Sequence, residues 1–152
     1  MISVKIEPFN VFKENTQLQN EQWEELAQND GFERELGVDF NLFDLFEMSG
    51  QLITFIAREN DKVVGYSLFI IQKDFHAQNT LCAHSDLIFL SKKSRKGRNG
   101  IVFIKEIQKM LGQIYPNIFV RWHVTEMKDF GNVLVKLGCK KFETIYAIRA
   151  GV

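Results

Sequence analysis

The sequence of 152 residues lacks an excess of charge of either sign. Nineteen basic and nineteen acidic residues balance, so no overall field draws the chain to nucleic acid or to a membrane. No apolar run approaches the roughly 20 residues of a membrane span, and the first residues lack the apolar core of a signal peptide. We therefore expect a cytoplasmic protein that engages neither membranes nor nucleic acid.

Cysteine is also scarce, with only Cys82 and Cys139 in the chain. Each lies in an apolar stretch, and neither has a metal-ligand partner at a convincing spacing. Buried free thiols are therefore expected in preference to a disulfide, a nucleophile or a metal site. The chain has no repeat, no low-complexity stretch and no linker, and its length predicts one domain over residues 1–152.

Hydrophobic patterns predict the first part of the chain as a strand followed by two helices. Residues 2–6 alternate between apolar and polar, which is typical of a half-buried strand, and Pro8 ends it. One helix is expected from residue 15 or 16 to about residue 29, before a turn at 29–31, and a second over residues 40–48.

The middle of the chain predicts three consecutive strands. Residues 52–71 form an expected hairpin that turns at Asn60 and Asp61. Gly65 within its second strand indicates a bulge or a close backbone approach. Residues 80–90 predict a third strand that extends the hairpin.

The last part predicts an alternation of helices and strands: a helix over 101–114, a strand over 118–124, a short helix from Asp129 to Leu137, and one or two strands over 139–149. The strands over 81–90 and 118–124 flank a helix, so we expect them to be parallel. The expected fold is α/β (or α+β), with a mixed, mostly antiparallel sheet of six or seven strands and about four helices on both faces.

The stretch from Leu87 to Ile101 carries the clearest functional signal. An apolar strand ends at Leu90, and an amphipathic helix begins near Ile101. The turn between them holds two glycines and five cations, which are Lys92, Lys93, Arg95, Lys96 and Arg98. The free N–H groups of a first helical turn attract anions, and glycine lets phosphates approach the backbone. A phosphate-binding loop is therefore favoured over a solvated basic turn.

Within this stretch, Arg95-Lys-Gly-Arg-Asn-Gly100 resembles the pyrophosphate loop of the GNAT-type N-acetyltransferases, which reads Arg/Gln-x-x-Gly-x-Gly/Ala. Arg98 replaces the usual middle glycine, and Gly97 lies one place earlier, a variant similar to phage and prophage members. Residues 83–90 and 123–146 also resemble that subgroup. The order of elements agrees over nearly the whole chain.

This resemblance implies transfer of an acetyl group from acetyl-CoA, as co-substrate and without a metal, directly to an amine. The strands over 81–90 and 118–124 are expected to splay apart and admit the thioester. The pyrophosphate would lie on the loop, and the pantetheine arm would pair with the strand before it. The cofactor-binding residues implied are Ile88, Phe89, Leu90, Arg95, Lys96, Gly97, Arg98, Asn99 and Gly100.

Two titratable residues precede this strand end. By strand alternation, His84 and Asp86 share a face with Ile88 and Leu90, so one or both would receive the proton of the amine. The alternatives are a satisfied core histidine and a buried carboxylate that accepts backbone hydrogen bonds. Further candidates, each with a structural or surface alternative, are His123, His76 and Glu143.

The acid that protonates the departing thiolate is less clear. The family often places a tyrosine where this chain has Leu134, so Tyr146 or solvent would act instead; Tyr146 has the alternative of a packed aromatic. The acceptor amine, on a small molecule or a protein, stays open, as does a homodimer. The competing hypothesis is a catalytically silent GNAT-fold phage protein that binds a host factor in the host cytoplasm.

Overall fold

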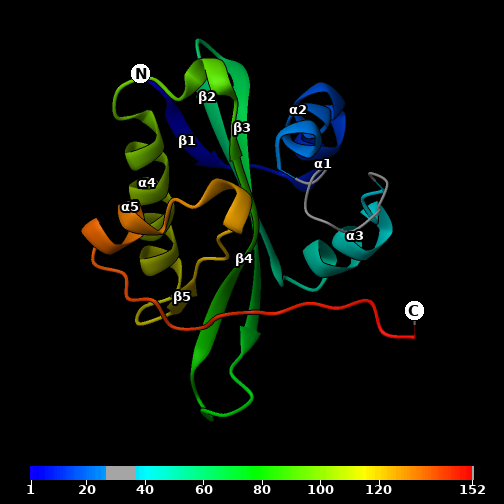
Figure 1. Ribbon diagram of the computed structural model, residues 1–152, viewed down its shortest axis with the longest axis vertical. Helices are drawn as coiled ribbons and strands as arrows, with labels where there is room; N and C mark the ends of the chain where they lie inside the picture. The colour runs from blue at the N-terminus through cyan, green and yellow to red at the C-terminus, as the bar shows by residue number, and fades with distance from the viewer. Residues whose placement is uncertain (27–36, 152) are drawn as a thin grey trace.

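A five-stranded sheet forms the centre of the computed structural model, which describes residues 1–26 and 37–151 (Figure 1). The strands lie in chain order. They are β1 (Ser3–Ile6), β2 (Leu52–Glu59), β3 (Lys62–Lys73), β4 (Leu81–Leu90) and β5 (Phe119–Arg121). The first four pair antiparallel, whereas β4 and β5 pair parallel. The predicted mixed, mostly antiparallel sheet with a parallel pair is therefore confirmed.

Helices cover both faces of the sheet. The helices are α1 (Phe9–Glu14), α2 (Thr16–Leu26), α3 (Phe40–Met48), α4 (Asn99–Ile114) and α5 (Gly131–Lys136). Helices α4 and α5 lie on one side, and α1, α2 and α3 lie on the other (Figure 1). Among the residues that the structure describes, no helix is both long and apolar enough to cross a membrane.

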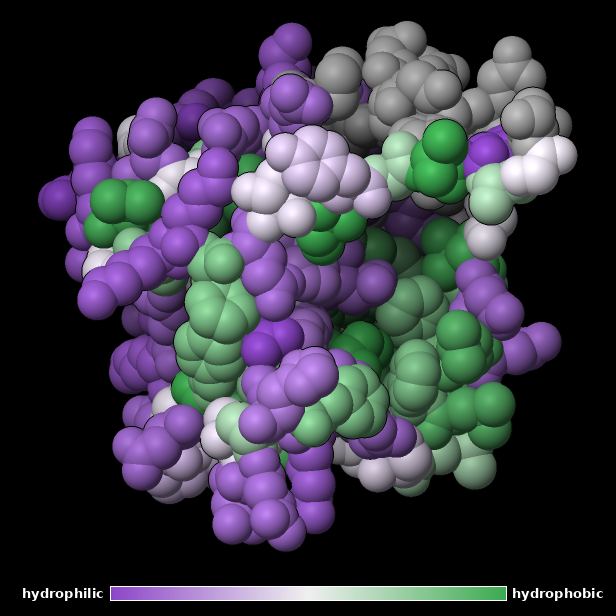
Figure 2. All heavy atoms as spheres, turned by 60° about the horizontal axis from the view of Figure 1, so that its bottom comes forward, coloured by the Kyte–Doolittle hydropathy of each residue, from purple (hydrophilic) through white to green (hydrophobic). Residues whose placement is uncertain are grey.

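Each face of the sheet has its own aromatic core. On the α4 side, Phe55, Phe69 and Phe103 are buried in one cluster. On the α1 side, Phe12 and Tyr66 meet edge to face, with ring centroids 4.7 Å apart. Burying one such side chain stabilises the fold by about 1.5–3 kcal/mol. The outer surface of α3 stays apolar, because Leu42, Leu45 and Met48 are exposed, and Figure 2 shows apolar surface gathered on this side.

The predicted hairpin is confirmed, together with its turn and its close approach. Asn60 and Asp61 both have positive φ angles, 50° and 62°, as a tight two-residue hairpin turn requires. A Cβ on Gly65 would lie only 2.7 Å from the carbonyl oxygen of Phe89. Glycine therefore allows β3 and β4 to approach at this point.

Helix predictions were accurate where the apolar pattern was long. The second predicted helix matches α3 at both ends, and Asp39 caps it by accepting a hydrogen bond from the Leu42 N–H at 3.0 Å. Helix α4 begins two residues earlier than predicted, at Asn99. The six-residue α1 was missed. The predicted turn at 29–31 lies outside the described residues.

The predicted number of strands is wrong. Among the described residues the sheet has five strands, not six or seven, and the five α-helices agree with the prediction of about four. Residues 139–149 form no strand, and β5 has three residues instead of the seven predicted over 118–124. A strand needs a paired edge, and so short a β5 offers little edge for the C-terminal residues.

Candidate active site

The parallel strands β4 and β5 are joined only at their beginnings. The pairs are Cys82 with Phe119, Ala83 with Val120, and His84 with Arg121. Beyond this point β4 continues to Leu90 against β3 alone, while β5 ends. The strands therefore separate after His84, as the resemblance implied, and leave a split that opens toward the end of β4.

A β-bulge in β4 lies where the split begins. Ser85 pairs with Phe69 and Leu87 pairs with Leu68, so Asp86 between them has no partner on β3. A bulge increases the local twist and redirects a side chain. It accounts for the position of Asp86 at the split and for the divergence of β4 from β5.

The bulge also overturns the predicted side-chain alternation. His84 pairs with Ile70, which packs on the α1 side of the sheet. Ile88 and Leu90 pack instead with the cluster on the α4 side. The prediction that His84 and Asp86 share a face with Ile88 and Leu90 is therefore wrong for His84, because one extra residue reverses the alternation.

His84, Asp86 and His123 nevertheless come together at the split. The rings of His84 and His123 lie 6.0 Å apart, and Nε2 of His84 lies 3.1 Å from Nε2 of Gln72. Burial lowers the pKa of His84 below 6.5, and the positive charge of Arg121 lowers it further. His84 is therefore mainly neutral at neutral pH and able to accept a proton.

Asp86 has its pKa shifted in the opposite direction. Partial desolvation raises the pKa of its carboxyl above 3.8, and the nearby His123 opposes this rise. A carboxylate with a raised pKa is a stronger base than a solvated one. The group is therefore a second base in contact with the split.

Of the other predicted candidates, Tyr146 and His76 lie elsewhere, whereas the charge of Glu143 acts on His84 and opposes the lowering of its pKa. Tyr146 is 91% exposed, and no hydrogen bond or ring contact joins it to His84, Asp86 or His123. His76 is exposed in the β3–β4 connection, where its backbone N–H donates to Asp74. Glu143 lies 4.0 Å from the guanidinium of Arg121.

The loop that follows β4 is held firmly in its first half. The Arg95 guanidinium donates to the carbonyl of Leu90 at 2.7 Å, forms a paired contact with the Glu25 carboxylate, and lies over the ring of Phe89. The Ser94 hydroxyl donates to Glu59 at 3.2 Å. These contacts tie the loop to α2 and β2, and the Arg95 ion pair lowers the pKa of Glu25.

The second half of the loop presents open hydrogen-bond donors. Among described residues, no acceptor is within reach of the backbone N–H groups of Lys96, Gly97, Arg98, Gly100 and Ile101. The positive φ of Gly97, 56°, turns the chain here. Consecutive free N–H groups at a helix start fit an anion with several oxygens.

Two of the predicted cofactor contacts are already engaged. The Arg95 guanidinium binds Glu25, so a phosphate would compete with this carboxylate. The Asn99 N–H donates to Lys96, and its side-chain amide donates to Ser94 at 3.0 Å. Both residues therefore shape the loop in this structure.

Two polar residues at the split were not singled out from the sequence. The hydroxyl of Ser85 and the indole N–H of Trp122 are buried and have no partner among the described residues. The signal that could have found them is the parallel register, which places these two residues one step beyond the last pair.

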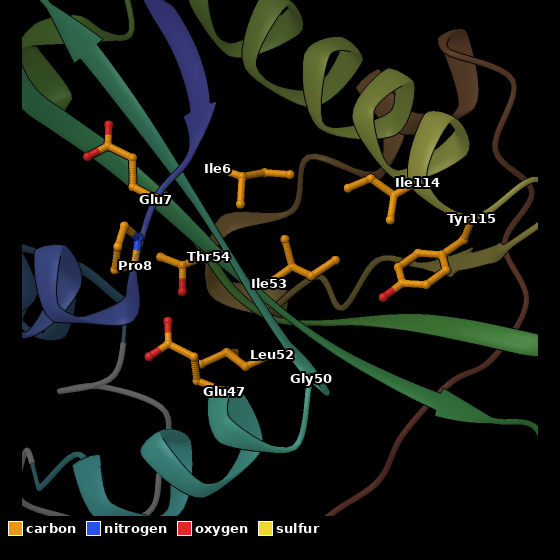
Figure 3. Close-up of a pocket in the computed structure, with 10 residues that line it drawn as sticks. All are labelled: Ile6, Glu7, Pro8, Glu47, Gly50, Leu52, Ile53, Thr54, Ile114 and Tyr115. Carbon is orange, nitrogen blue, oxygen red and sulfur yellow. The ribbon is translucent and has the colours of Figure 1, made fainter.

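A hollow of about 420 Å³ lies at the edge of the sheet opposite to β5 (Figure 3). Its lining includes Glu7 and Glu47, but Glu7 is paired with Arg58 at 2.7 Å, and Glu47 accepts the Phe9 N–H. This hollow lies at β1 and β2, across the sheet from the split. Among residues 1–26 and 37–151, no group of three acidic, His or Cys side chains could hold a metal.

Comparison with known proteins identifies structures that share this fold. No protein-family model and no curated protein matches the sequence. A ribosomal-protein-alanine N-acetyltransferase from Brucella melitensis biovar Abortus 2308 is similar, with 12% identity, TM-score 0.72, and coverage of 99% of this chain and 100% of that one. An aminoglycoside acetyltransferase from an uncultured soil metagenomic sample has 17% identity, TM-score 0.71, and coverage of 99% of both chains.

A third similar structure is a predicted acetyltransferase from Clostridium acetobutylicum with acetyl-CoA, at 12% identity and TM-score 0.68, covering 98% of this chain and 96% of that one. Identities this low establish architecture alone. The protein therefore has the GNAT fold. Which residues react, and on what, depends on the site itself.

Proposed function

We propose that the protein transfers an acetyl group from acetyl-CoA directly to an amine. The observation that carries this proposal is the split between β4 and β5. Its open end leads to the loop with free N–H groups, and its closed end holds His84, Asp86 and His123. An anion site and a pair of bases at the two ends of the same unpaired edge of β4 suit a phosphate-bearing acyl donor and an amine.

The loop and β4 supply the cofactor half of the site. The N–H groups of residues 96–101 would hold the pyrophosphate, helped by the dipole of α4. Apart from its chain neighbours and the adjoining helix backbone, no described atom lies within 4 Å of a Cβ built on Gly100, so the approach to the helix start is open. Beyond His84 the outer edge of β4 has no strand partner, which leaves Ile88 and Phe89 to pair with the amide groups of pantetheine. The similar Clostridium acetobutylicum structure contains acetyl-CoA, which supports acetyl-CoA as the acyl donor.

The residues at the closed end supply the base. An amine attacks a thioester only when it is neutral, so a group must take its proton. His84 is neutral because its pKa is lowered, and Gln72 orients its ring. Asp86 would receive the proton from the amine directly or through water, with His123 stabilising its charge. Backbone N–H groups of β4 would polarise the carbonyl.

Calorimetry with acetyl-CoA is the first test of this proposal. We expect binding in the micromolar range, roughly −8 kcal/mol, and release of free thiol when amines are added. Absence of acetyl-CoA binding would show that the fold serves another purpose, such as the capture of a host factor.

Asp86→Asn separates binding from chemistry. Within the described part of the chain, the exposed Asp86 carboxylate makes no hydrogen bond or ion pair, so the variant should bind acetyl-CoA as the parent does. Loss of a general base should lower kcat by about 10²–10⁴. Ser67→Ala, on the neighbouring strand β3, is the matched control. An unchanged kcat in Asp86→Asn would assign the proton to His84.

The fold alone does not determine which amine accepts the acetyl group. The similar structures include enzymes named for aminoglycosides, for a ribosomal-protein alanine and for glucosamine 6-phosphate. These acceptors share an amine and little else. The phage-like subgroup, the cytoplasmic location, a homodimer and Tyr146 as acid stay predictions from the sequence.

A further inference from the structure

Two polar groups meet where β4 and β5 begin to separate. The last parallel pair joins His84 to Arg121, so Ser85 and Trp122 are the next residues on the two strands. Both face the α4 side: Ser85 pairs with Phe69, and the ring of Trp122 meets that of Phe69 edge to face at 5.1 Å. Both residues therefore lie beside Phe69 on the same face of the sheet, at the base of the split.

Neither group has a hydrogen-bond partner among the described residues. The hydroxyl oxygen of Ser85 and the indole nitrogen of Trp122 are both buried, and Ser85 is 0% exposed. A buried donor without an acceptor costs about 1–3 kcal/mol. Two such donors beside the same Phe69, at the point where the paired strands end, indicate an acceptor supplied by a ligand.

The surroundings restrict the kind of acceptor. The indole N–H can only donate, and the serine hydroxyl can donate as well. Phe69 and Trp122 make the base of the split apolar, which suits a large, polarizable atom better than a hydrated oxygen. The arm that runs along β4 from the loop toward Ser85 would end here in its sulfur.

The tyrosine that the family resemblance implies for this position is absent. Leu134 occupies the corresponding place in α5 and is 5% exposed, so it offers no proton or hydrogen bond. Because of this, the leaving group needs another source of stabilisation within the site.

We propose that Ser85 Oγ and Trp122 Nε1 donate hydrogen bonds to the sulfur of coenzyme A and stabilise it as the departing thiolate. This inference rests on the proposed acetyltransferase function. As the amine nitrogen bonds to the carbonyl carbon, the C–S bond breaks and its electron pair goes to sulfur. The proton leaves the amine for Asp86 or His84, and sulfur later takes a proton from solvent.

The test uses binding rather than turnover. Coenzyme A and desulfo-coenzyme A are titrated into the protein by calorimetry between pH 6.5 and 9.5. If the donors stabilise the thiolate, coenzyme A gains affinity over the desulfo compound as pH rises. A hydrogen bond to a charged group has a strength that corresponds to roughly tenfold or more in this ratio.

Two variants and one control complete the design. Ser85→Ala and Trp122→Phe should each reduce the ratio by about tenfold while the desulfo compound binds as before. Ser67→Ala is the control, since its buried hydroxyl donates instead to the Leu87 carbonyl at 2.9 Å; its ratio should equal that of the parent.

An NMR measurement on the parent protein avoids any folding defect in the variants. The indole N–H resonance of Trp122, assigned with Trp23→Phe, should move further with coenzyme A than with desulfo-coenzyme A. Equal resonances and an unchanged ratio in Ser85→Ala would overturn the inference while leaving the acetyltransferase intact. Failure of both compounds to bind would overturn the proposed function and this inference with it.

Discussion

The loop after β4 and the C-terminal residues 139–149, here called the tail, are held in very different ways. The loop is fixed by carboxylates from three distant residues: Glu21 accepts the Lys92 N–H at 3.0 Å, Glu25 binds Arg95, and Glu59 accepts the Ser94 hydroxyl. Each contact joins segments more than thirty residues apart. The first half of the loop is therefore rigid, and the second half can offer its N–H groups.

The first residues of the tail are also held by side-chain contacts, whereas the later ones are exposed. Phe142 packs against Phe119 with ring centroids 5.3 Å apart and lies over the Arg121 guanidinium. Farther on, Ile145 and Ile148 are 75% and 88% exposed. Alternation alone therefore does not make a strand, whereas specific long-range partners make even a polar loop well defined.

The largest expected effect is on the open half of the loop. Arg98→Glu combined with Gly100→Glu places two carboxylates where the pyrophosphate would lie. Acetyl-CoA affinity should fall by more than about a hundredfold, because like charges meet at the helix start. Calorimetry measures the affinity, and circular dichroism should show an unchanged fold, since both residues are exposed.

Lys93→Glu is the control for charge alone. Lys93 is exposed in the anchored half of the same loop, away from the free N–H groups. We expect less than about a threefold change in affinity, owing to screening by salt. Equal losses in both proteins would mean that net charge, not a built phosphate site, governs binding.

A smaller effect is expected from the anchored half. Arg95→Leu removes the Glu25 pair and the contact with Phe89. Because Arg95 is partly solvent-exposed, the free energy of unfolding should fall by only about 1 kcal/mol. Acetyl-CoA affinity should fall about three- to tenfold, since a looser loop must be ordered on binding.

Denaturant unfolding and calorimetry measure the two effects of Arg95→Leu. The matched control is Lys128→Leu, which also loses a pair with Glu25, at 3.0 Å, but lies outside the loop. If Arg95→Leu lost more than about a hundredfold in affinity with unchanged stability, Arg95 would bind phosphate directly.

The pH dependence of the free energy of unfolding should report on His84 at the split, which belongs to neither the loop nor the tail. The pKa of His84 is lowered from 6.5, chiefly by burial, so the unfolded chain binds more protons. Stability is then fully present above pH 6.5 and is lost as pH falls through the folded pKa. His84→Gln should flatten this slope in urea unfolding experiments. A slope equal to that of the parent would show that His84 is hydrated.

Much of the fold followed from local sequence. The hairpin turn at Asn60 and Asp61, the ends of α3 and the helix after the loop all depend on neighbouring residues. The loop itself could be found because glycines and cations cluster there. In the site, His84 and Asp86 could be named as candidates, yet their orientation could not.

What escaped prediction depends on pairing between strands. The bulge at Asp86 appears only when β4 is matched against β3, and it places His84 on the other face. Ser85 and Trp122 became visible only through the parallel register and their missing partners. Neither residue has a local signal that separates it from ordinary core positions.

The smallest effect is expected in the tail, and it tests the comparison most directly. Ile145→Ser combined with Ile148→Ser replaces two largely exposed side chains. Surface substitutions of this kind change the free energy of unfolding by about 0.5 kcal/mol or less. Ile107→Ala, at a 0% exposed position of α4, should cost about 2–5 kcal/mol in the same urea titration. A loss above about 2 kcal/mol in the tail variant would mean that these isoleucines are buried in solution, and that the alternating pattern does form the strand that the sequence predicts.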